Sequence, residues 1–370
     1  MEQASPLARH RDDGPVLTWG CLGLDSHDEL SHIALTRRVA DFLGKEYHGR
    51  LEDYRCSRRP YCVPRATLCG AECSPHLPYP GEGDFLGGQV SHPMAATKAI
   101  VHPLAPDEAL DPTWPGSFAR VAADLTLPGF TATTSRGAIA AGRKLLQAGD
   151  IRIKLVSASG GTQQQVATSL DELFYVIDTL TGDDGLFDCL VLEENLTDVR
   201  TFSVGQIMLG GVSAAYMGEQ QLTLNNQRQE VYGGSCLQVS RGRLSDLVEA
   251  LSGEERNLCE LGMRFDHLAT RHLGLVASRR NYDLISGRDS RGRIKHAVLE
   301  QSWRVGGASG AEIAALKAFA HDPDLHKVQA STVEQYGDDI VPPRDADVYF
   351  HGVDPELGPL LKYSHVQDAR

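Results

Sequence analysis

The sequence predicts a mixed protein of the α/β (α+β) class, and three stretches carry this prediction. Residues 16–21 form a short apolar run, which is followed by a helical pattern of apolar residues up to Leu43. Residues 151–156 alternate as a strand between two helical stretches. Residues 281–286 and 294–301 both have strand character, and the turn-rich sequence GRDSRGR between them predicts a hairpin.

The length of 370 residues is enough for two or three domains. We expect an N-terminal α/β domain over residues 1–93, followed by two α+β units over 94–205 and 206–330. The Pro- and Asp-rich segment 331–370 is expected to be a tail that wraps the surface.

Composition excludes some classes of protein. The net charge is −13, which disfavours a general nucleic-acid binder, because such proteins need clustered Lys and Arg. No run approaches the 18 apolar residues of a membrane span, and the polar N-terminus shows no secretory signal. We therefore expect a cytoplasmic protein that binds neither nucleic acid nor membrane; a homodimer is one form it could take.

Four of the eight cysteines lie close together: Cys56, Cys62, Cys69 and Cys73. Their spacing lacks the paired C-x2-C of common structural zinc sites. Free Cys is also among the most buried residue types. A metal site and buried thiols without a metal both stay open at this point.

The predicted helices have suitable residues at their ends. Ser, Thr and Asp side chains can accept the free N–H groups of a first helical turn. The candidate N-caps are Asp25 or Ser26 for the first helix, Thr134 or Ser135 for a helix over 136–148, and Ser169 for a helix over 171–181. Gly149 is placed to end the second of these helices.

Lys154 lies among apolar neighbours on the predicted strand 151–156, and a Ser/Gly-rich tip follows it. That tip contains Ser159, Gly160 and Gly161, whose backbone N–H groups could cover phosphates as a flexible flap. A lysine among apolar residues needs an anionic partner unless it extends outwards. The stretch is not a Walker A loop, because the lysine precedes the glycines.

The hairpin carries the residues with the clearest metal chemistry. Asp283 lies on its first strand and Glu300 near the end of its second, so the two carboxylates can meet. Arg304 follows four residues later, ahead of the flexible stretch 306–310. Carboxylates bind hard cations, whereas Arg and backbone amides bind phosphate. The hairpin could equally be a turn with solvated acids, and its neighbours along the chain decide between the two.

Those neighbours occur in a recognisable order: Lys98, then Lys154 before the Gly-rich flap, then a strand ending in Glu-Glu-x-Leu, then the hairpin ending E-x-x-x-R. This order resembles the ATP-grasp superfamily over roughly residues 90–320. The whole chain is most similar to an uncharacterised bacterial family of ATP-grasp-like proteins. The resemblance implies that residues 1–93 form a pre-ATP-grasp domain and that the units 94–205 and 206–330 clasp ATP with Mg²⁺.

The resemblance also implies roles for the nucleotide-binding residues. Lys154 would contact the α-phosphate and the adenine region, and Lys98 would contact phosphate from the preceding segment. Glu193, Glu194 and Leu196 would form the hinge, where a Glu side chain and backbone groups read the adenine edge. An acidic strand end without such a role is the alternative for the two glutamates.

At the metal end, the resemblance implies that Asp283 and Glu300 hold Mg²⁺ and that Arg304 meets phosphate. Ser302 stands where many relatives have Asn, and a hydroxyl is the weaker metal ligand. Asn281 stands where some ligases have an Arg for the acyl phosphate, so Arg279 or Arg280 would have to substitute for it.

We therefore expect an ATP-dependent ligase that joins a small-molecule carboxylate to an amine or thiol acceptor through an acyl phosphate, with Lys154 and Arg304 stabilising the developing charge. Two alternatives stay open: a phosphotransferase on the same scaffold, and a nucleotide-binding regulatory protein without catalysis.

Overall fold

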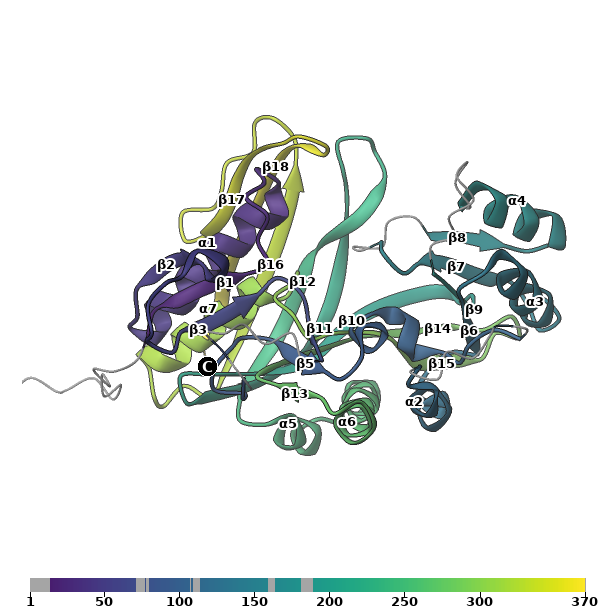
Figure 1. The fold of residues 1–370 in the computed structure, drawn as a ribbon, viewed down its shortest axis with the longest axis horizontal. Helices are drawn as coiled ribbons and strands as arrows, with labels where there is room; N and C mark the ends of the chain where they lie inside the picture. The colour runs from purple at the N-terminus through teal and green to yellow at the C-terminus, as the bar shows by residue number, and fades with distance from the viewer. Residues whose placement is uncertain are drawn as a thin grey trace, which may run out of the picture.

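The computed structural model describes residues 14–70, 77, 80–106, 108, 114–158, 164–180 and 189–369. These residues form a mixed α/β structure with three parts along its longest axis (Figure 1). An N-terminal layer lies at one end, a small four-stranded sheet lies at the other, and a large sheet connects them. The predicted fold class is confirmed.

The N-terminal layer is a small parallel sheet with one long helix. Its strands, in the order β2-β1-β3, are β1 (Val16–Trp19), β2 (Tyr47–Arg50) and β3 (Tyr61–Pro64). The crossover helix α1 (His27–Leu43) starts after Ser26, whose Oγ accepts the Glu29 N–H at 3.4 Å. It ends at Gly44, which takes a left-handed φ of 64°. The expected strand, cap and helix are therefore present.

The small sheet is antiparallel and is covered by two helices. Its strands, in the order β6-β9-β7-β8, are β6 (Gly129–Ala132), β7 (Ile151–Leu155), β8 (Gln164–Ala167) and β9 (Leu190–Glu194). The helices are α3 (Ser135–Leu145) and α4 (Leu170–Leu180). Thr134 caps α3 by accepting the Gly137 N–H at 3.0 Å. This helix ends at Leu145, three residues before the predicted end, and turns lead on to Gly149.

The large sheet has eight antiparallel strands in the order β15-β14-β10-β11-β12-β16-β18-β17. The strands are β10 (Thr197–Leu209), β11 (Val212–Leu224), β12 (Glu230–Arg241), β14 (Arg279–Arg288), β15 (Ile294–Ser302), β16 (Lys327–Tyr336), β17 (Asp347–Asp354) and β18 (Gly358–Ala369). The hairpin predicted for residues 281–301 is β14–β15 at one edge.

Two expectations about the chain's organisation need correction. Residues 331–370 were expected to be a surface tail, but β16 continues to Tyr336 and the hairpin β17–β18 closes the far edge of the large sheet. The boundary at residue 205 falls inside β10, which is continuous. The apolar side chains of these strands are buried, and leaving them in water would cost free energy. The strands therefore belong to the sheet and form neither a surface tail nor a domain boundary.

Helices cover the large sheet on both faces (Figure 1). On one face lie α5 (Leu244–Ala250) and α6 (Gly253–Leu273), with α2 (Gly116–Val121) beside α6. On the other face lies α7 (Ser309–His321), next to α1. The short strands β4 (Leu68–Cys69), β5 (Gly88–Val90) and β13 (Val276–Ala277) form a connecting sheet. No helix in the described part of the chain is long and apolar enough to cross a membrane.

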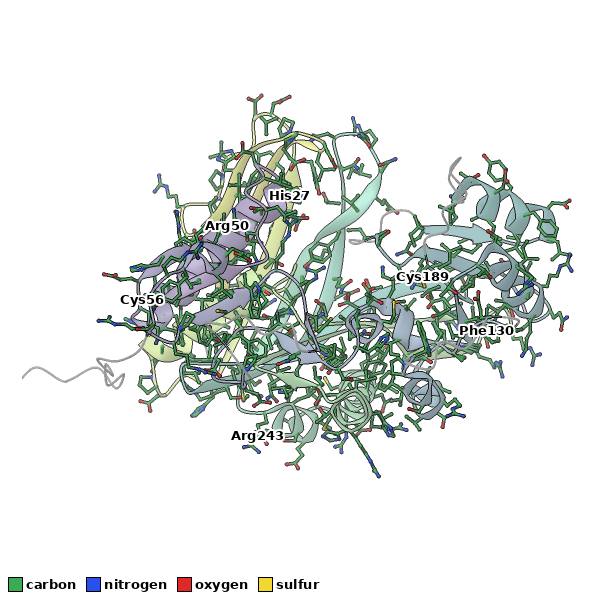
Figure 2. All side chains as sticks on the ribbon, viewed as in Figure 1. His27, Arg50, Cys56, Phe130, Cys189 and Arg243 are labelled. Atoms are coloured by element: carbon green, nitrogen blue, oxygen red, sulfur yellow. The ribbon has the colours of Figure 1, made fainter. Side chains whose placement is uncertain are left out.

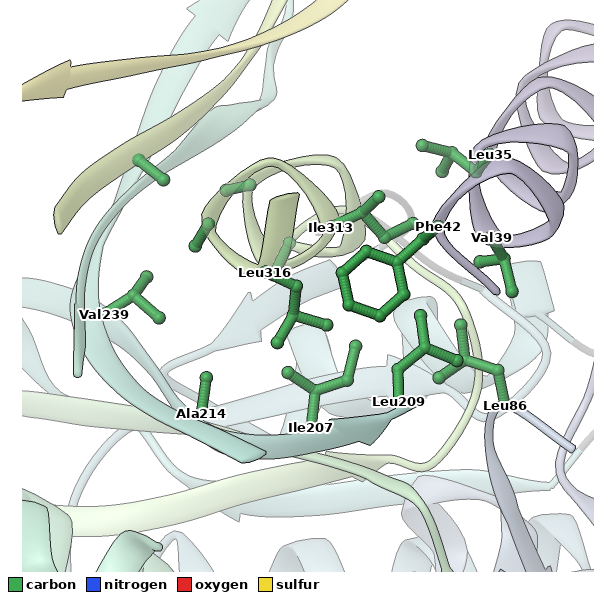
Figure 3. Close-up of a cluster of buried hydrophobic side chains, with 14 of the residues drawn as sticks. Leu35, Val39, Phe42, Leu86, Ile207, Leu209, Ala214, Val239, Ile313 and Leu316 are labelled. Atoms are coloured by element: carbon green, nitrogen blue, oxygen red, sulfur yellow. The ribbon is translucent and has the colours of Figure 1, made fainter. Parts of the chain in front are cut away.

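One apolar core joins the N-terminal layer to the large sheet (Figure 3). Phe42 of α1 packs with Ile313 and Leu316 of α7 above Ile207 and Leu209 of β10. Burial of such side chains stabilises by about 1.5–3 kcal/mol each. This core fixes α1 and the start of α7 against the sheet face that carries the candidate site.

Candidate functional site

Asp283 and Glu300 face each other across the hairpin β14–β15. They are direct cross-strand partners, so their side chains leave the same face of the sheet. The register shifts immediately beside the pair, between Asp283 and Leu284. Bulges of this kind often lie next to functional sites, where they redirect side chains. The structure thus brings the two acids together, as the hairpin pattern predicted.

The environment of Asp283 disfavours a bare negative charge. Burial, and then the charge of Glu300, raise the pKa of Asp283 to about 7. Two amides oppose this by donating to Asp283 Oδ1, Gln220 Nε2 at 2.8 Å and Asn281 Nδ2 at 3.0 Å. A divalent cation between the carboxylates would relieve their repulsion, and oxygen ligands of this kind suit Mg²⁺. The donor set therefore fits the metal that the sequence implied.

Lys98 joins this hairpin to the small sheet. It begins the 3₁₀ turn 98–101, and its Nζ lies 3.2 Å from Glu300 Oε2. The same Nζ donates to the carbonyl of Ala158 at 2.7 Å, just beyond β7. Lys98 therefore stands where the β14–β15 hairpin approaches the base of the expected flap. The flap residues Ser159, Gly160 and Gly161 lie outside the described residues.

Lys154 is buried on β7 and has a carboxylate partner in the adjacent strand. Its Nζ lies 2.6 Å from Glu193 Oε1 of β9, while His102 Nε2 lies 3.1 Å from Glu193 Oε2. Burial alone would raise the pKa of Glu193, but the positive charge of Lys154 and the His102 hydrogen bond lower it to about 2. Glu193 is thus held as an anion that fixes the position of Lys154.

The other two residues of the expected hinge, Glu194 and Leu196, also have partners within the protein. Glu194 forms an ion pair with Lys295 of β15, so neither hinge carboxylate is without a partner. The Leu196 side chain is buried with Leu127 and Ile285. The adenine contact that we assigned to a Glu side chain and to backbone groups of the hinge stays a prediction, and both Glu side chains already have partners within the protein.

Arg304 is a half-buried guanidinium without an acidic partner in the described part of the chain. Its Nη1 donates to the Val305 carbonyl at 3.0 Å. Burial, and then the charge of Arg279, lower the pKa of Arg304, while Glu300, Asp28 and Asp283 oppose this. A half-buried cation in this setting is suited to an anionic ligand, and a guanidinium matches phosphate well.

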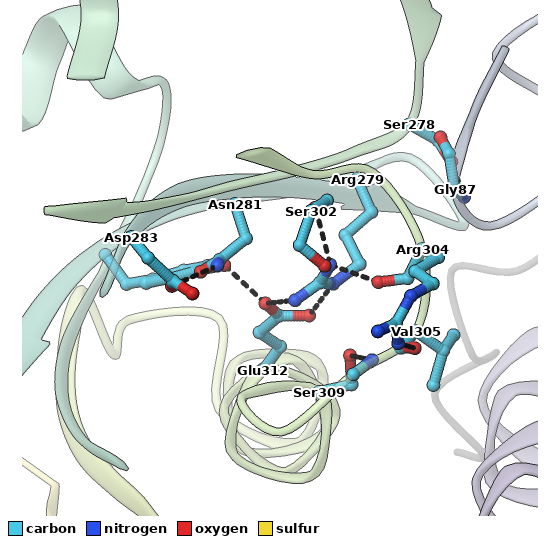
Figure 4. A network of polar contacts seen from close by, with 12 residues as sticks. Gly87, Ser278, Arg279, Asn281, Asp283, Ser302, Arg304, Val305, Ser309 and Glu312 are labelled. Atoms are coloured by element: carbon cyan, nitrogen blue, oxygen red, sulfur yellow. Dashed lines mark hydrogen bonds and ion pairs between the residues drawn. The ribbon is translucent and has the colours of Figure 1, made fainter. Parts of the chain in front are cut away.

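The neighbouring Arg279 and Arg280 are not available to replace the arginine missing at position 281. Arg279 is fully buried and makes two hydrogen bonds to Glu312 of α7, at 2.7 and 2.8 Å (Figure 4). Arg280 forms ion pairs with Glu82 and Asp266. Arg304 is therefore the arginine left to meet a ligand.

The Arg279–Glu312 pair belongs to a buried network that supports the site (Figure 4). Arg279 donates to the carbonyls of Ser302 and Arg304, which fixes the chain between them. Tyr216 donates to Glu312 and lies within hydrogen-bond distance of Asn281, which in turn donates to Asp283. Neither Glu312 nor Tyr216 was predicted from the sequence as part of the site.

Gly205 makes room for this network. A Cβ at this position would lie 2.4 Å from the Tyr216 hydroxyl and 2.2 Å from the Arg280 carbonyl. Contacts this short are excluded, so β10 needs glycine here. A glycine inside the alternating strand 201–208 was the one sequence signal for this close approach.

The cysteine cluster does not form a metal site among the described residues. Cys62 is buried in an apolar core, where burial raises its pKa to about 12, and Cys56 is exposed. No group of three or more His, Cys, Asp or Glu side chains is placed to hold a metal in the described ranges. Cys73 lies outside those ranges.

A partly open pocket of about 180 Å³ lies apart from the site, between the α3–β7 turn and the tip of the β14–β15 hairpin. Its lining includes Gly149, Asp289, Arg293 and Lys295, but neither Lys154 nor Glu300. Arg293 and Lys295 are already paired with Asp289. The carboxylate pair is the stronger candidate site, because there two carboxylates oppose each other directly.

Comparisons with known proteins agree on the fold. The family described as "Protein of unknown function (DUF3182)" matches residues 23–364. Biotin carboxylase from Campylobacter jejuni, solved with an ATP analogue, superposes with a TM-score of 0.50 at 11% identity, covering 97% of this chain and 89% of that one. Sequence comparison with curated proteins gives no match.

Two further solved structures are similar at lower scores. Phosphoribosylamine–glycine ligase from Thermotoga maritima gives a TM-score of 0.47 at 12% identity, over 95% of this chain and 91% of that one. D-alanyl-alanine synthetase A from Vibrio cholerae gives 0.45 at 14% identity, over 79% and 89%. At a TM-score of 0.50, the likeness to biotin carboxylase confirms the expected ATP-grasp fold.

Proposed function

The chain belongs to the DUF3182 family, and on the geometry of its site we propose that it is an ATP-dependent ligase that joins a carboxylate to an amine or a thiol. One observation carries the proposal. The directly opposed acids Asp283 and Glu300 are reached by Lys98 and act electrostatically on Arg304, which has no acidic partner among the described residues. Two carboxylates and two cations at one place suit a metal–polyphosphate complex.

Asp283 and Glu300 would hold Mg²⁺, with Ser302 as a third oxygen donor. Mg²⁺, when bound, offsets the charge of the phosphates. Lys154 would contact phosphate from β7 and is kept in place by Glu193. Lys98 would leave Glu300 for a phosphate oxygen, because the metal offers Glu300 a stronger partner.

In the first step a carboxylate oxygen of the substrate attacks the γ-phosphorus of ATP, the bond to ADP breaks, and an acyl phosphate forms. Arg304 would bind the phosphoryl oxygens, since it is a half-buried cation without an acidic partner among the described residues. In the second step the amine or thiol attacks the acyl carbon and phosphate leaves. Arg279, paired with Glu312, fixes the backbone carbonyl of Arg304 and would keep this residue in place in both steps.

The first test is binding of a non-hydrolysable ATP analogue by titration calorimetry with and without Mg²⁺. We expect Mg²⁺-dependent binding by the wild type and loss of that dependence in Glu300→Gln. Glu255→Gln, at an exposed position on α6, is the matched control and should bind as the wild type does. Absence of nucleotide binding by the wild type would refute the proposal.

The second test is turnover with pools of acids, amines and thiols, in which the acid carries ¹⁸O in its carboxylate. A ligase produces ADP, an amide or thioester, and phosphate containing ¹⁸O. A phosphotransferase produces ADP and a phosphorylated product without ¹⁸O transfer into phosphate. Nucleotide binding without turnover in any pool would favour the regulatory alternative.

A further inference from the structure

The small sheet has one face that packs on helices and one that carries charged side chains. Ile153 of β7 and Leu192 of β9 belong to the apolar cluster that α3 and α4 complete. Successive side chains of a strand point to opposite faces, so the next residues, Lys154 and Glu193, lie on the other face. The proposed contact of Lys154 with the nucleotide is therefore made on this second face.

Both oxygens of the Glu193 carboxylate have a partner there. Lys154 Nζ lies 2.6 Å from Oε1, and His102 Nε2 lies 3.1 Å from Oε2. The exposed fractions of the three side chains are 8% for Lys154, 2% for Glu193 and 1% for His102. Glu193 is ionised, and an ionised carboxylate only accepts hydrogen bonds. His102 Nε2 therefore carries a proton and donates it to Glu193.

Gly129 of β6 leaves the space that the His102 ring occupies. It is the register partner of Glu193, so a side chain at position 129 would lie beside Glu193 on the same face. A Cβ there would lie 2.7 Å from Cε1 and 2.8 Å from Nδ1 of His102. Phe130, the next residue of β6, marks this strand in Figure 2. The imidazole thus packs directly on the strand backbone, in the place of the missing side chain.

The backbone on both sides of His102 is tied to the same strand. Thr131 Oγ1 donates to the Ala99 carbonyl at 2.7 Å, and the Thr131 N–H donates to the Pro103 carbonyl at 2.8 Å. Thr131 is fully buried. The ring of His102 and its backbone are therefore both held in place before a ligand binds, which suits a residue that supports a binding site.

Lys154 alone would not fix the orientation of Glu193. An ammonium group is a point charge with rotatable donors on a flexible stem. The terminal torsion of a Glu side chain is also broad, so the carboxylate plane can turn. The rigid imidazole holds Oε2, and this sets the direction in which Oε1 faces Lys154.

We propose that His102 is a positioning residue for nucleotide binding: it fixes Glu193, and Glu193 holds the Lys154 ammonium group where it contacts a phosphate. An ammonium group has three donors, so the contact with Glu193 leaves donors for the phosphate. This inference rests on the proposed function, because it requires that Lys154 meets the nucleotide.

The test is titration calorimetry of a non-hydrolysable ATP analogue with Mg²⁺, using two amide variants of His102. Gln places its Nε2 where His has Nε2, whereas Asn is one methylene shorter and does not reach Glu193. We expect His102→Gln to bind nearly as the wild type does and His102→Asn to bind about tenfold more weakly, because a hydrogen bond to a charged group is lost. Binding by His102→Asn should still depend on Mg²⁺, since Asp283 and Glu300 are unchanged. His267→Asn, at an exposed position on α6, should bind as the wild type does.

A double variant tests whether His102 acts through Glu193. Glu193→Gln should weaken binding by itself. Adding His102→Asn to it should cause no further loss, because the carboxylate that His102 holds is already gone. Urea denaturation of the same samples shows whether each variant is folded. Should His102→Asn fail to fold, His102→Met takes its place, because Met has the length of Gln but donates no hydrogen bond.

The outcomes separate this inference from the proposed function. Wild-type affinity in His102→Asn, the same loss in His102→Gln as in His102→Asn, or losses that multiply in the double variant would each overturn the positioning role. If the wild type binds no nucleotide, the proposed function fails and this inference fails with it. If the wild type binds nucleotide and His102→Asn binds equally well, only this inference fails.

Discussion

Replacing Asp283 by Asn should make the metal-free protein more stable at neutral and alkaline pH. The folded protein binds the Asp283 proton more tightly than the unfolded chain does, because burial and Glu300 raise the pKa from 3.8 to about 7. Stability from this group is therefore complete below about pH 4 and is lost as the pH rises to about 7. Asn cannot ionise, and its amide oxygen can still accept from Gln220 and Asn281.

The size of the effect follows from the pKa. A difference of one bound proton changes the free energy of unfolding by about 1.4 kcal/mol for each pH unit. Between pH 5.5 and 7, a span of 1.5 units, the wild type should therefore lose about 2 kcal/mol in free energy of unfolding relative to Asp283→Asn. Urea denaturation with EDTA at pH 5.5, 7 and 8.5 measures this difference. Asp178→Asn, at an exposed position on α4, is the matched control and should follow the wild type.

Addition of Mg²⁺ provides the complementary measurement. The wild type should recover stability, since the cation removes the repulsion between Asp283 and Glu300, and Asp283→Asn should recover less. Parallel pH curves for the wild type and Asp283→Asn would refute the reasoning, because they would show that the carboxyl group titrates alike in the folded and unfolded chains.

Three further variants test the surroundings of the site. Glu312→Gln removes one partner of a buried ion pair and leaves the Arg279 charge uncompensated. The free energy of unfolding, measured by urea denaturation, should therefore fall by about 3–5 kcal/mol. A fall of less than about 1 kcal/mol would contradict this. Glu193→Gln should weaken binding of the ATP analogue in calorimetry, since Lys154 loses the anion that fixes it, and unchanged affinity would mean that Lys154 does not contact the nucleotide. Arg304→Ala should abolish turnover while raising stability or leaving it unchanged, because the change removes a half-buried guanidinium without an acidic partner among the described residues; marked destabilisation would indicate a structural role instead.

Local patterns predicted the parts of the site that lie on single elements. Lys154 stood out as a cation among apolar residues on one strand, and the hairpin pattern brought Asp283 to Glu300. In both cases the relevant contacts are set by strand alternation or by a short turn. Such features can be read from a sequence without knowing the tertiary structure.

Contacts between distant segments could not be predicted in this way. Tyr216 and Glu312 are 96 residues apart, and only the packing of α7 on the large sheet joins them. The Pro- and Asp-rich character of residues 331–370 suggested a tail, yet the end of β16 and the strands β17 and β18 in this segment complete the sheet. Composition describes a connecting segment well, but it does not show what its ends pair with.

The most direct test of the central claim is a crystal structure with an ATP analogue and Mn²⁺, measured at the manganese absorption edge. The ion should give an anomalous peak within coordination distance of both Asp283 and Glu300, with the γ-phosphate near Arg304 and the α-phosphate near Lys154. A peak elsewhere, or a nucleotide that contacts Lys154 while Glu300 faces a different cavity, would contradict the account.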